Sequence, residues 1–397
     1  MSFLSPGNMR KNLSKVGLTP ERLFFTCYIV WLTFFFISSL TMFDYWFPRV
    51  FFIVMRAIPL LGLALSEYLS TTFSKKSLFG YLFIVLSGIV AYVSGDYYLF
   101  DISVIIVASR HYEFEKVVKA FLIVAVTMTF ITIFATHLGL IQNRDFSSAD
   151  RSRRAWGFKY ATFLAHLFFF ITMSFAIVLK QKFNYYHALI LFIVNLWIFA
   201  ITDTRNPFML ATIYIVFVYY YNNFEYFRGL CLKVAKFLTP SFILTSCFIA
   251  FLSLTYKIFG FTHFFDKLLT GRIYLGHEAI RVHGIQPFGQ DLNMVGYATL
   301  RSNHQITDNS YNYIDSSYLQ MLVLHGWIYF IALISLLTYT MVLIYRKKNM
   351  YLFAAMVLLA IHSMVDPQLT MLWYSPLLIT IGMVFKDTPL NVTKKTR

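Results

Sequence analysis

The sequence predicts an all-α polytopic membrane protein, and three observations lead to this fold class. Apolar residues make up 58% of the 397 residues, charged residues make up only 13%, and the mean hydropathy is +0.63. A soluble protein carries about 25% charged residues, so this chain has too few of them to cover a water-facing surface. Apolar runs recur along the whole chain, and one membrane span needs about 20 such residues. We therefore expect about 12 transmembrane helices.

The apolar runs and the loops between them divide the chain into five parts. These are a tail (1–22), nine spans with a basic loop at 141–157 (23–256), a long loop (257–317), three spans (318–386) and a second tail (387–397). Several expected spans are short, among them 97–109, 185–201 and 371–385. The polar segments leave no room for a large domain outside the membrane.

The positive charges predict the orientation of the chain. If both termini are cytoplasmic, the inner segments carry 15 Lys and 6 Arg, whereas the outer segments carry 3 Lys and 9 Arg. The inner excess satisfies the positive-inside rule. The net charge of +16 is thus explained by the positive residues that orient the chain in a membrane. We expect no nucleic-acid partner, because the chain lacks the polar surface of a basic nucleic-acid-binding protein. The outer preference for arginine favours anion recognition, since a guanidinium group binds phosphate through two hydrogen bonds; chance and headgroup anchoring are the alternatives.

The outer arginines are concentrated in three loops. The first loop, 142–157, contains a cluster of Arg151, Arg153 and Arg154, which either binds an anion or anchors the loop at lipid headgroups. The second is the short turn 202–207, where Arg205 stands at the start of a helix, a position that favours anions. Pairing of Arg205 with Asp203 is the alternative interpretation.

The third loop, 257–317, is the longest and carries the most varied chemistry. Its apolar spacing predicts an amphipathic helix over 271–282 with Arg272 at its start. Asp315, Glu278 and His304 are further candidates for binding or proton transfer, although Asp315 fits a helix N-cap equally well. The histidines of this loop lack metal-ligand spacing, and so do the three cysteines, so we expect no metal and no cofactor.

A last interruption of apolar sequence contains His362 and Asp366, followed by Pro367. Ionisable residues within spans are functional candidates by default. Asp366 and Pro367 also fit a simple turn between the last two spans.

The order of these features resembles the bacterial oligosaccharide repeat-unit polymerases (the Wzy family), which are relatives of the O-antigen ligases. The matching pieces run through most of the chain: Arg154-Ala-Trp-Gly157-Phe158, Thr204-Arg205, Leu269-Thr-Gly271-Arg272, Pro287-Phe-Gly289, Asp315-Ser-Ser-Tyr318 with Gly326, and Asp366-Pro367 with Tyr374-Ser-Pro376. Three positions depart from the family pattern. Ala161-Thr162 replaces a common Pro-Asn, Gly276 replaces an aromatic residue, and Ser316 replaces an Asn after the late Asp.

The resemblance implies a GT-C-like architecture and a metal-independent glycosyltransferase in the bacterial cytoplasmic membrane. Its substrate would be an undecaprenyl-diphosphate-linked oligosaccharide, and its partners would include a chain-length regulator and a flippase besides the lipid bilayer. Arg205, Arg272 and Asp315 would be catalytic, and the substrate-binding residues would be Arg151, Arg153, Arg154, Glu278 and His304. An O-antigen ligase and a lipid-linked oligosaccharide flippase are the alternative functions.

Overall fold

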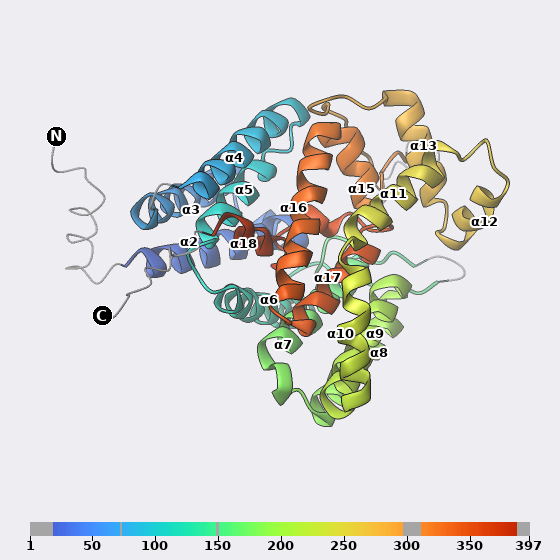
Figure 1. Cartoon of the computed structure of the whole chain (residues 1–397), viewed down its shortest axis with the longest axis horizontal. Helices are drawn as coiled ribbons and strands as arrows, with labels where there is room; N and C mark the ends of the chain where they lie inside the picture. The colour runs from blue at the N-terminus through green and yellow to red at the C-terminus, as the bar shows by residue number, and fades with distance from the viewer. Residues whose placement is uncertain (1–18, 72–73, 148–150, 297–310, 387–397) are drawn as a thin grey trace, which may run out of the picture.

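The computed structural model describes residues 19–71, 74–147, 151–296 and 311–386, and in these residues the fold is entirely helical (Figure 1). This confirms the predicted all-α class. The helices of the first half are α2 (Pro20–Phe35), α3 (Arg49–Ser70), α4 (Lys75–Ser94), α5 (Tyr98–Ser109), α6 (Phe114–His137), α7 (Phe163–Leu179) and α8 (Tyr185–Thr202). Those of the second half are α9 (Arg205–Asn223), α10 (Glu225–Leu238), α11 (Ser241–Leu254), α12 (Phe261–Leu268), α13 (Arg272–His283), α15 (Ser317–Gln320), α16 (Gly326–Arg346), α17 (Met350–His362) and α18 (Gly382–Phe385).

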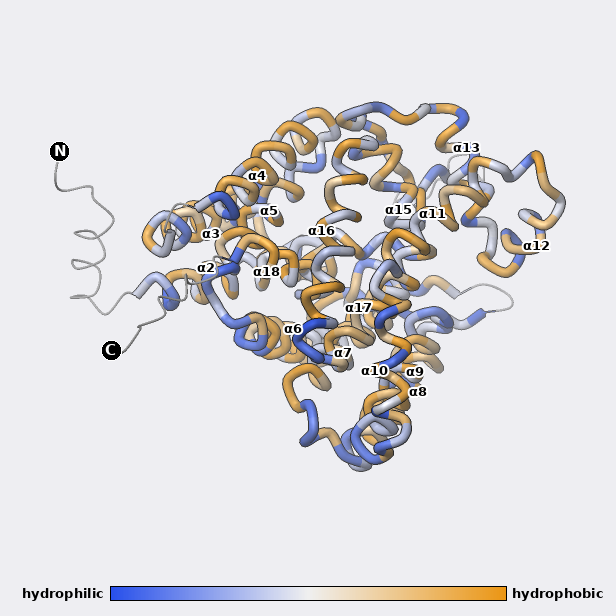
Figure 2. The backbone as a smooth tube through the Cα atoms, viewed as in Figure 1, coloured by the Kyte–Doolittle hydropathy of each residue, from blue (hydrophilic) through white to orange (hydrophobic). Residues whose placement is uncertain are grey.

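Within the described residues, seven helical segments are long and apolar enough to cross a membrane, or eight if the bent pair α10 and α11 forms one span. The seven are Pro20–Leu40, Arg49–Ser70, Lys75–Ser94, Phe114–His137, Phe163–Lys182, Tyr185–Thr202 and Ser317–Arg346. Apolar residues cover most of these helices, and polar residues collect in the loops at their ends (Figure 2). The described residues therefore form a helical membrane protein with seven or eight candidate spans, and they do not confirm the 12 spans expected.

Loops that the charge distribution assigns to the same side of the membrane lie together in the fold. On the predicted outer side, the ammonium group of Lys159 lies 2.7 Å from the carboxylate of Asp44. On the predicted inner side, Lys116 lies 2.7 Å from Glu21. Residues that were assigned to the same side of the membrane thus contact each other at the same end of the helix bundle. Which end faces the outside stays a prediction.

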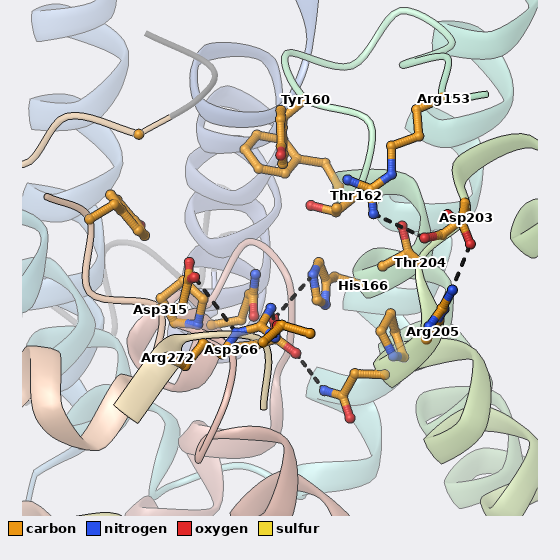
Figure 3. A pocket seen from close by; sticks show the side chains of 18 of the residues that line it. Arg153, Tyr160, Thr162, His166, Asp203, Thr204, Arg205, Arg272, Asp315 and Asp366 are labelled. Carbon is orange, nitrogen blue, oxygen red and sulfur yellow. Dashed lines mark hydrogen bonds and ion pairs between the residues drawn. The ribbon is translucent and has the colours of Figure 1, made fainter. Parts of the chain in front are cut away.

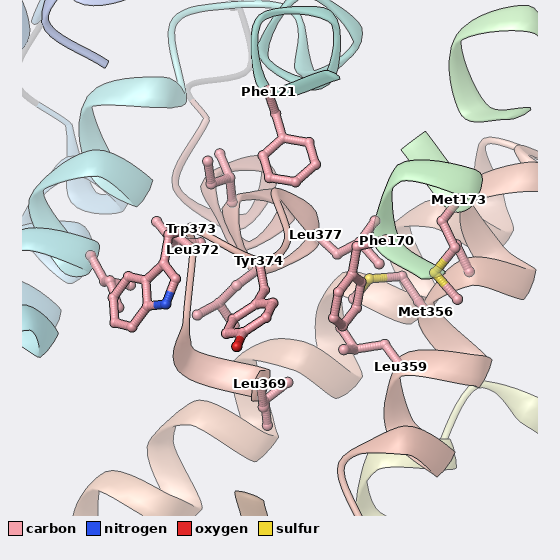
Figure 4. Packing of buried hydrophobic residues seen from close by; sticks show 14 of the residues in the cluster. Phe121, Phe170, Met173, Met356, Leu359, Leu369, Leu372, Trp373, Tyr374 and Leu377 are labelled. Carbon is pink, nitrogen blue, oxygen red and sulfur yellow. The ribbon is translucent and has the colours of Figure 1, made fainter. Parts of the chain in front are cut away.

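The segment 371–385 is not the regular span that its hydropathy predicts. It consists of turns and short helices, with 3₁₀ geometry at Leu377–Ile381. Pro376 interrupts it, and a proline inside a helix removes a backbone donor and clashes with the preceding turn. Side chains of α6, α7 and α17 enclose the segment (Figure 4). Irregular backbone is tolerated at membrane depth where protein surrounds it, and this burial explains the strong apolar signal.

Helix α10 is a regular amphipathic helix of 14 residues. It contacts α9 and meets α11 at a bend of 55°. Tyr226 and Phe237 on one face are exposed, whereas Ala235 on the opposite face is buried. Hydropathy alone misses such a helix because its polar face lowers the mean value.

The two charged residues within the early expected spans pair with each other. Arg56 on α3 donates from Nε and Nη2 to the carboxylate of Asp101 on α5, at 2.6 and 2.8 Å. Trp31 on α2 donates to the same carboxylate at 3.3 Å. Asp101 is fully buried, so this pair fixes α5 between α2 and α3.

Replacing the carboxylate in Asp101→Leu should lower the free energy of unfolding, because it leaves Arg56 without its partner. We expect a loss of about 1–3 kcal/mol, less than for a fully buried pair because the side chain of Arg56 is 32% exposed. The double variant Arg56→Leu/Asp101→Leu should recover most of this loss. Thermal unfolding in detergent measures both effects, and an unchanged midpoint in the single variant would contradict the structural role.

Candidate functional site

A cavity of about 1280 Å³ opens where loops at the predicted outer end of the bundle converge. Among the described residues, its walls come from the segments 151–166, 199–207, 270–275, 294–296, 311–315 and 366–368. In the described chain, the charged residues of this lining are four arginines and three aspartates: Arg151, Arg153, Arg205, Arg272, Asp203, Asp315 and Asp366. Figure 3 shows two groups, one around Asp203 and one around Arg272, with His166 between them. We call the first group the rim and the second the floor.

The rim is a cluster of three arginines around Asp203, which ends α8 in a left-handed backbone conformation. Arg151 pairs with the carboxylate of Asp203, and Arg153 donates from Nη2 to the backbone oxygen of Asp203 at 3.0 Å. The buried Nε of Arg153 has no hydrogen-bond partner within the described chain. Burial, with the nearby charge of Arg151, lowers the pKa of Arg153. The rim therefore holds more positive charge than its single carboxylate neutralises.

Arg205 is the first residue of α9, as predicted, and it lies at the edge of the rim. Its Nε is 4.0 Å from Asp203, and its side chain is 75% exposed. The hydroxyl of Thr204, which occupies the N-cap position, bonds to the backbone oxygen of Thr202 and does not cap α9. The start of α9 thus keeps backbone N–H groups and one mobile guanidinium group available to an anion.

The floor is centred on Arg272, which lies between two carboxylates. Its Nε is 3.6 Å from Asp315, and its Nη2 is 3.6 Å from Asp366. Both distances exceed those of hydrogen bonds, and Nε is buried without a hydrogen-bond partner in the part of the chain that the structure describes. Only Nη1 is held, by the hydroxyl of Thr270 at 2.8 Å and more loosely by a backbone oxygen. The edge of the guanidinium group formed by Nε and Nη2 therefore faces the carboxylates of Asp315 and Asp366 without a hydrogen bond to either.

Two local features position Arg272. The carboxylate of Asp266 on α12 accepts hydrogen bonds from the backbone N–H groups of Ile273 and Tyr274, at 2.9 and 3.0 Å, and so caps the start of α13. One turn later, Gly276 allows α13 to pack against α15, since a Cβ atom there would lie 2.3 Å from a methyl group of Leu319. This close packing leaves no room for a side chain at Gly276, where the family that the sequence resembles has an aromatic residue.

One interpretation of the sequence made Asp315 a helix N-cap, but the structure does not place it there. Ser316 caps α15 instead, since its hydroxyl accepts from the backbone N–H of Leu319. The carboxylate of Asp315 faces Arg272 and accepts a weak hydrogen bond from Tyr311. Burial raises the pKa of Asp315 to about 6, although the charge of Arg272 opposes this shift. Asp315 can therefore exchange a proton close to neutral pH.

Beneath the floor, two buried histidines converge on Asp366. Nδ1 of His166 on α7 is 3.1 Å from Nε2 of His362, the last residue of α17. The same two side chains approach the Asp366 carboxylate at 3.7 and 3.5 Å, and Asn206 donates to it from the start of α9. Sequence reasoning named His362 and Asp366 as candidates but missed His166, which lies inside an uninterrupted apolar helix. A histidine in a span was the one available signal.

Two of the predicted site residues, Arg154 and Glu278, do not line the cavity. Arg154 is exposed and only its backbone is held, by Ile201. Glu278 pairs with Arg281 at 2.6 Å on the outside of α13, and the hydrogen bond from Arg281 lowers the pKa of Glu278, which makes it a poor base. His304 lies outside the described residues. The structure therefore groups Arg151, Arg153, Arg205, Arg272 and Asp315 and separates Arg154 and Glu278 from them.

The fold and the cavity together define a helical membrane protein with an arginine-rich binding site among loops at one end of its bundle. Comparison with known proteins finds no matching family model, no similar curated protein and no similar solved structure. The assignment of a function therefore depends on the chemistry of the cavity and on the resemblance of the sequence motifs.

The raised pKa of Asp315 predicts a pH-dependent effect of Asp315→Asn on stability. Above pH 6 the ionised carboxylate is less favourable in the folded chain than in the unfolded chain, whereas well below its unfolded pKa of 3.8 it is protonated in both. Removing the charge should therefore raise the free energy of unfolding at pH 8 by about 1–3 kcal/mol, and this gain should disappear as the pH falls to about 3. Melting temperatures across this range provide the measurement.

The matched control for this experiment is Glu278→Gln. The pKa of Glu278 is lowered by its partner Arg281, so its ionised form favours the folded chain and the substitution should bring no gain at pH 8. Equal melting curves for wild type and Asp315→Asn at pH 8 would show that Asp315 is not destabilised by burial.

Proposed function

We propose that the protein is a polysaccharide repeat-unit polymerase. It would transfer a growing glycan from undecaprenyl diphosphate onto a lipid-linked repeat unit at the outer face of the bacterial cytoplasmic membrane. The substrate therefore combines a diphosphate at headgroup depth with an oligosaccharide outside the membrane. Such a substrate requires a wide polar cavity with guanidinium groups near the membrane surface.

The observation that carries this proposal is the Nε and Nη2 edge of Arg272, which lies in the cavity without a hydrogen bond, 3.6 Å from Asp315 and Asp366. A guanidinium edge of this kind binds two oxygens of a phosphate group at once. The rim arginines supply additional charge for the second phosphate or for the second lipid-linked substrate. The motifs around residues 204, 272, 315 and 366, which carry the sequence resemblance, are far apart in the chain and line this one cavity.

The cavity also suits the sugars of the substrate. Sites for drug-sized ligands have volumes of about 300–1,000 Å³, so about 1280 Å³ leaves room for several sugar rings beside the diphosphate. Four tyrosines contribute to its lining: Tyr160, Tyr274, Tyr311 and Tyr313. Aromatic rings provide flat apolar faces with a polar end, which match the alternating apolar and hydroxyl surfaces of a sugar.

In the proposed reaction, the hydroxyl oxygen of the acceptor sugar bonds to the anomeric carbon of the donor glycan. The bond between that carbon and the diphosphate oxygen breaks, and undecaprenyl diphosphate leaves with the electron pair. Arg272, and Arg205 at the rim, stabilise the negative charge that develops on the leaving group. Asp315 accepts the proton of the acceptor hydroxyl, and its pKa of about 6 leaves it ionised yet able to hold that proton at neutral pH.

The substitutions Arg272→Lys and Arg205→Lys should each abolish chain extension, because an ammonium group keeps the charge but loses the two-point contact with phosphate. The loss of polymer in cells should exceed about 100-fold, as for removal of one transition-state donor. Arg281→Lys is the matched control, since Arg281 lies on the same helix as Arg272 but outside the cavity. Full-length polysaccharide in cells that carry either cavity variant would refute the diphosphate role.

Glycan analysis of a deletion strain distinguishes the proposed activity from its alternatives. A polymerase predicts that single repeat units are still displayed while the ladder of longer chains disappears. Loss of all lipid-A-linked glycan would indicate a ligase, and accumulation of repeat units on the cytoplasmic side would indicate a flippase. A normal ladder would exclude the polymerase and the ligase together.

A further inference from the structure

We propose that His166, His362 and Asp366 form a binding site for one divalent transition-metal ion, with Zn²⁺ as its best-suited occupant. One ligand atom from each residue can be chosen so that all three lie within 4.8 Å of one another, and all three residues are buried. Two imidazoles and one carboxylate form a donor set typical of zinc sites that keep a fourth position open. This inference does not rest on the polymerase activity, and it departs from the metal-independent reaction that the sequence resemblance implies.

The two histidines lie within hydrogen-bond distance of each other, whereas their distances to Asp366 are longer than hydrogen bonds and compatible with a shared ion. The separations of 3.5 and 3.7 Å between imidazole nitrogens and the Asp366 carboxylate exceed the usual N–H···O range of about 2.7–3.2 Å. Two ligands that each lie about 2.0–2.1 Å from a tetrahedral ion are roughly 3.4 Å apart. The 3.5 Å between Nε2 of His362 and the Asp366 carboxylate is close to that separation. His166 would contribute one nitrogen, either Nδ1, which is 3.1 Å from His362, or Nε2, which is 3.7 Å from Asp366.

The charge of the floor also favours a cation. Among the described residues of the floor, Arg272 is the one cationic side chain, and it faces two carboxylates, Asp315 and Asp366. With neutral histidines, the floor of a cavity otherwise lined by arginines therefore carries a net negative charge when both carboxylates are ionised. A divalent ion at Asp366 would reverse the sign of the floor and make it complementary to an anionic ligand.

The surroundings of the three residues supply the remaining features of a metal site. Asn206 donates a hydrogen bond to Asp366 and so orients its carboxylate, as residues around metal ligands commonly do. His166 and Asp366 both line the cavity, whereas His362 lies behind them with no exposed surface. An ion held by the three residues would therefore direct its fourth position towards the cavity, where water or a phosphate oxygen of the ligand can bind.

The experiment uses the full chain, purified in detergent without a histidine tag, depleted of metal with a chelator and then titrated with Zn²⁺. We expect about one tightly held zinc ion per chain, measured by elemental analysis after gel filtration. Titration with Co²⁺ should produce the visible absorption bands of four-coordinate cobalt. His166→Gln and His362→Gln should each weaken zinc binding by at least about tenfold.

His277→Gln is the matched control, because His277 is a partly buried histidine next to an acidic residue but lies outside the cavity. It should bind zinc as the wild type does. The wild-type titration decides the proposal even if a histidine variant fails to fold. Absence of stoichiometric zinc and of the cobalt bands in the wild type would overturn the proposal, and so would wild-type zinc affinity in both cavity variants. No glycan or lipid-linked substrate is present, so a negative result leaves the proposed polymerase activity standing.

Discussion

The buried carboxylate of Asp366 is the contact on which the arrangement of the cavity depends. Arg272 from α13, Asn206 from α9, His166 from α7 and His362 from α17 all approach it. Its backbone oxygen accepts a hydrogen bond from Ser317 at the start of α15. Polar groups buried among apolar helices have no water to solvate them, so each must find its partner within the protein. Five helix ends therefore meet at one aspartate.

At the floor of the cavity, groups that the proposed function requires lower the stability of the fold. Arg272 keeps one edge of its guanidinium group without hydrogen bonds, and Asp315 is held where its ionised form is unfavourable. Each of these features costs folding free energy, and each would be removed by a tighter local ion pair. Strained or incompletely satisfied groups persist where binding or proton transfer needs them. The packing of Gly276 against α15 and the cap from Asp266 offset that cost by fixing α13.

The sequence predicted those parts of the structure that are determined locally. Mean hydropathy and apolar runs were sufficient for the helical membrane fold, and the start of α13 at Arg272 followed from its amphipathic pattern. Five of the predicted site residues do line one cavity, because arginine in an outer loop is informative by itself. His166 could not be found in this way, since its role depends on a partner nearly two hundred positions later in the chain. The prediction of a regular span at 371–385 was wrong for a related reason. Burial in protein and burial in lipid select the same apolar residues, so hydropathy does not distinguish them.

The enclosed position of residues 366–385 has a consequence for how the protein is made. This segment leaves the ribosome after all the helices that surround it, and its turns contain backbone groups that lipid cannot satisfy. It cannot enter the bilayer as an independent span, so the earlier helices must first assemble and leave a space to receive it. Asp366 and the floor of the cavity are then completed at the last stage of biogenesis. A chain that stalls before this point would lack Asp366 and therefore the contacts that bring Arg272, Asn206, His166 and His362 together.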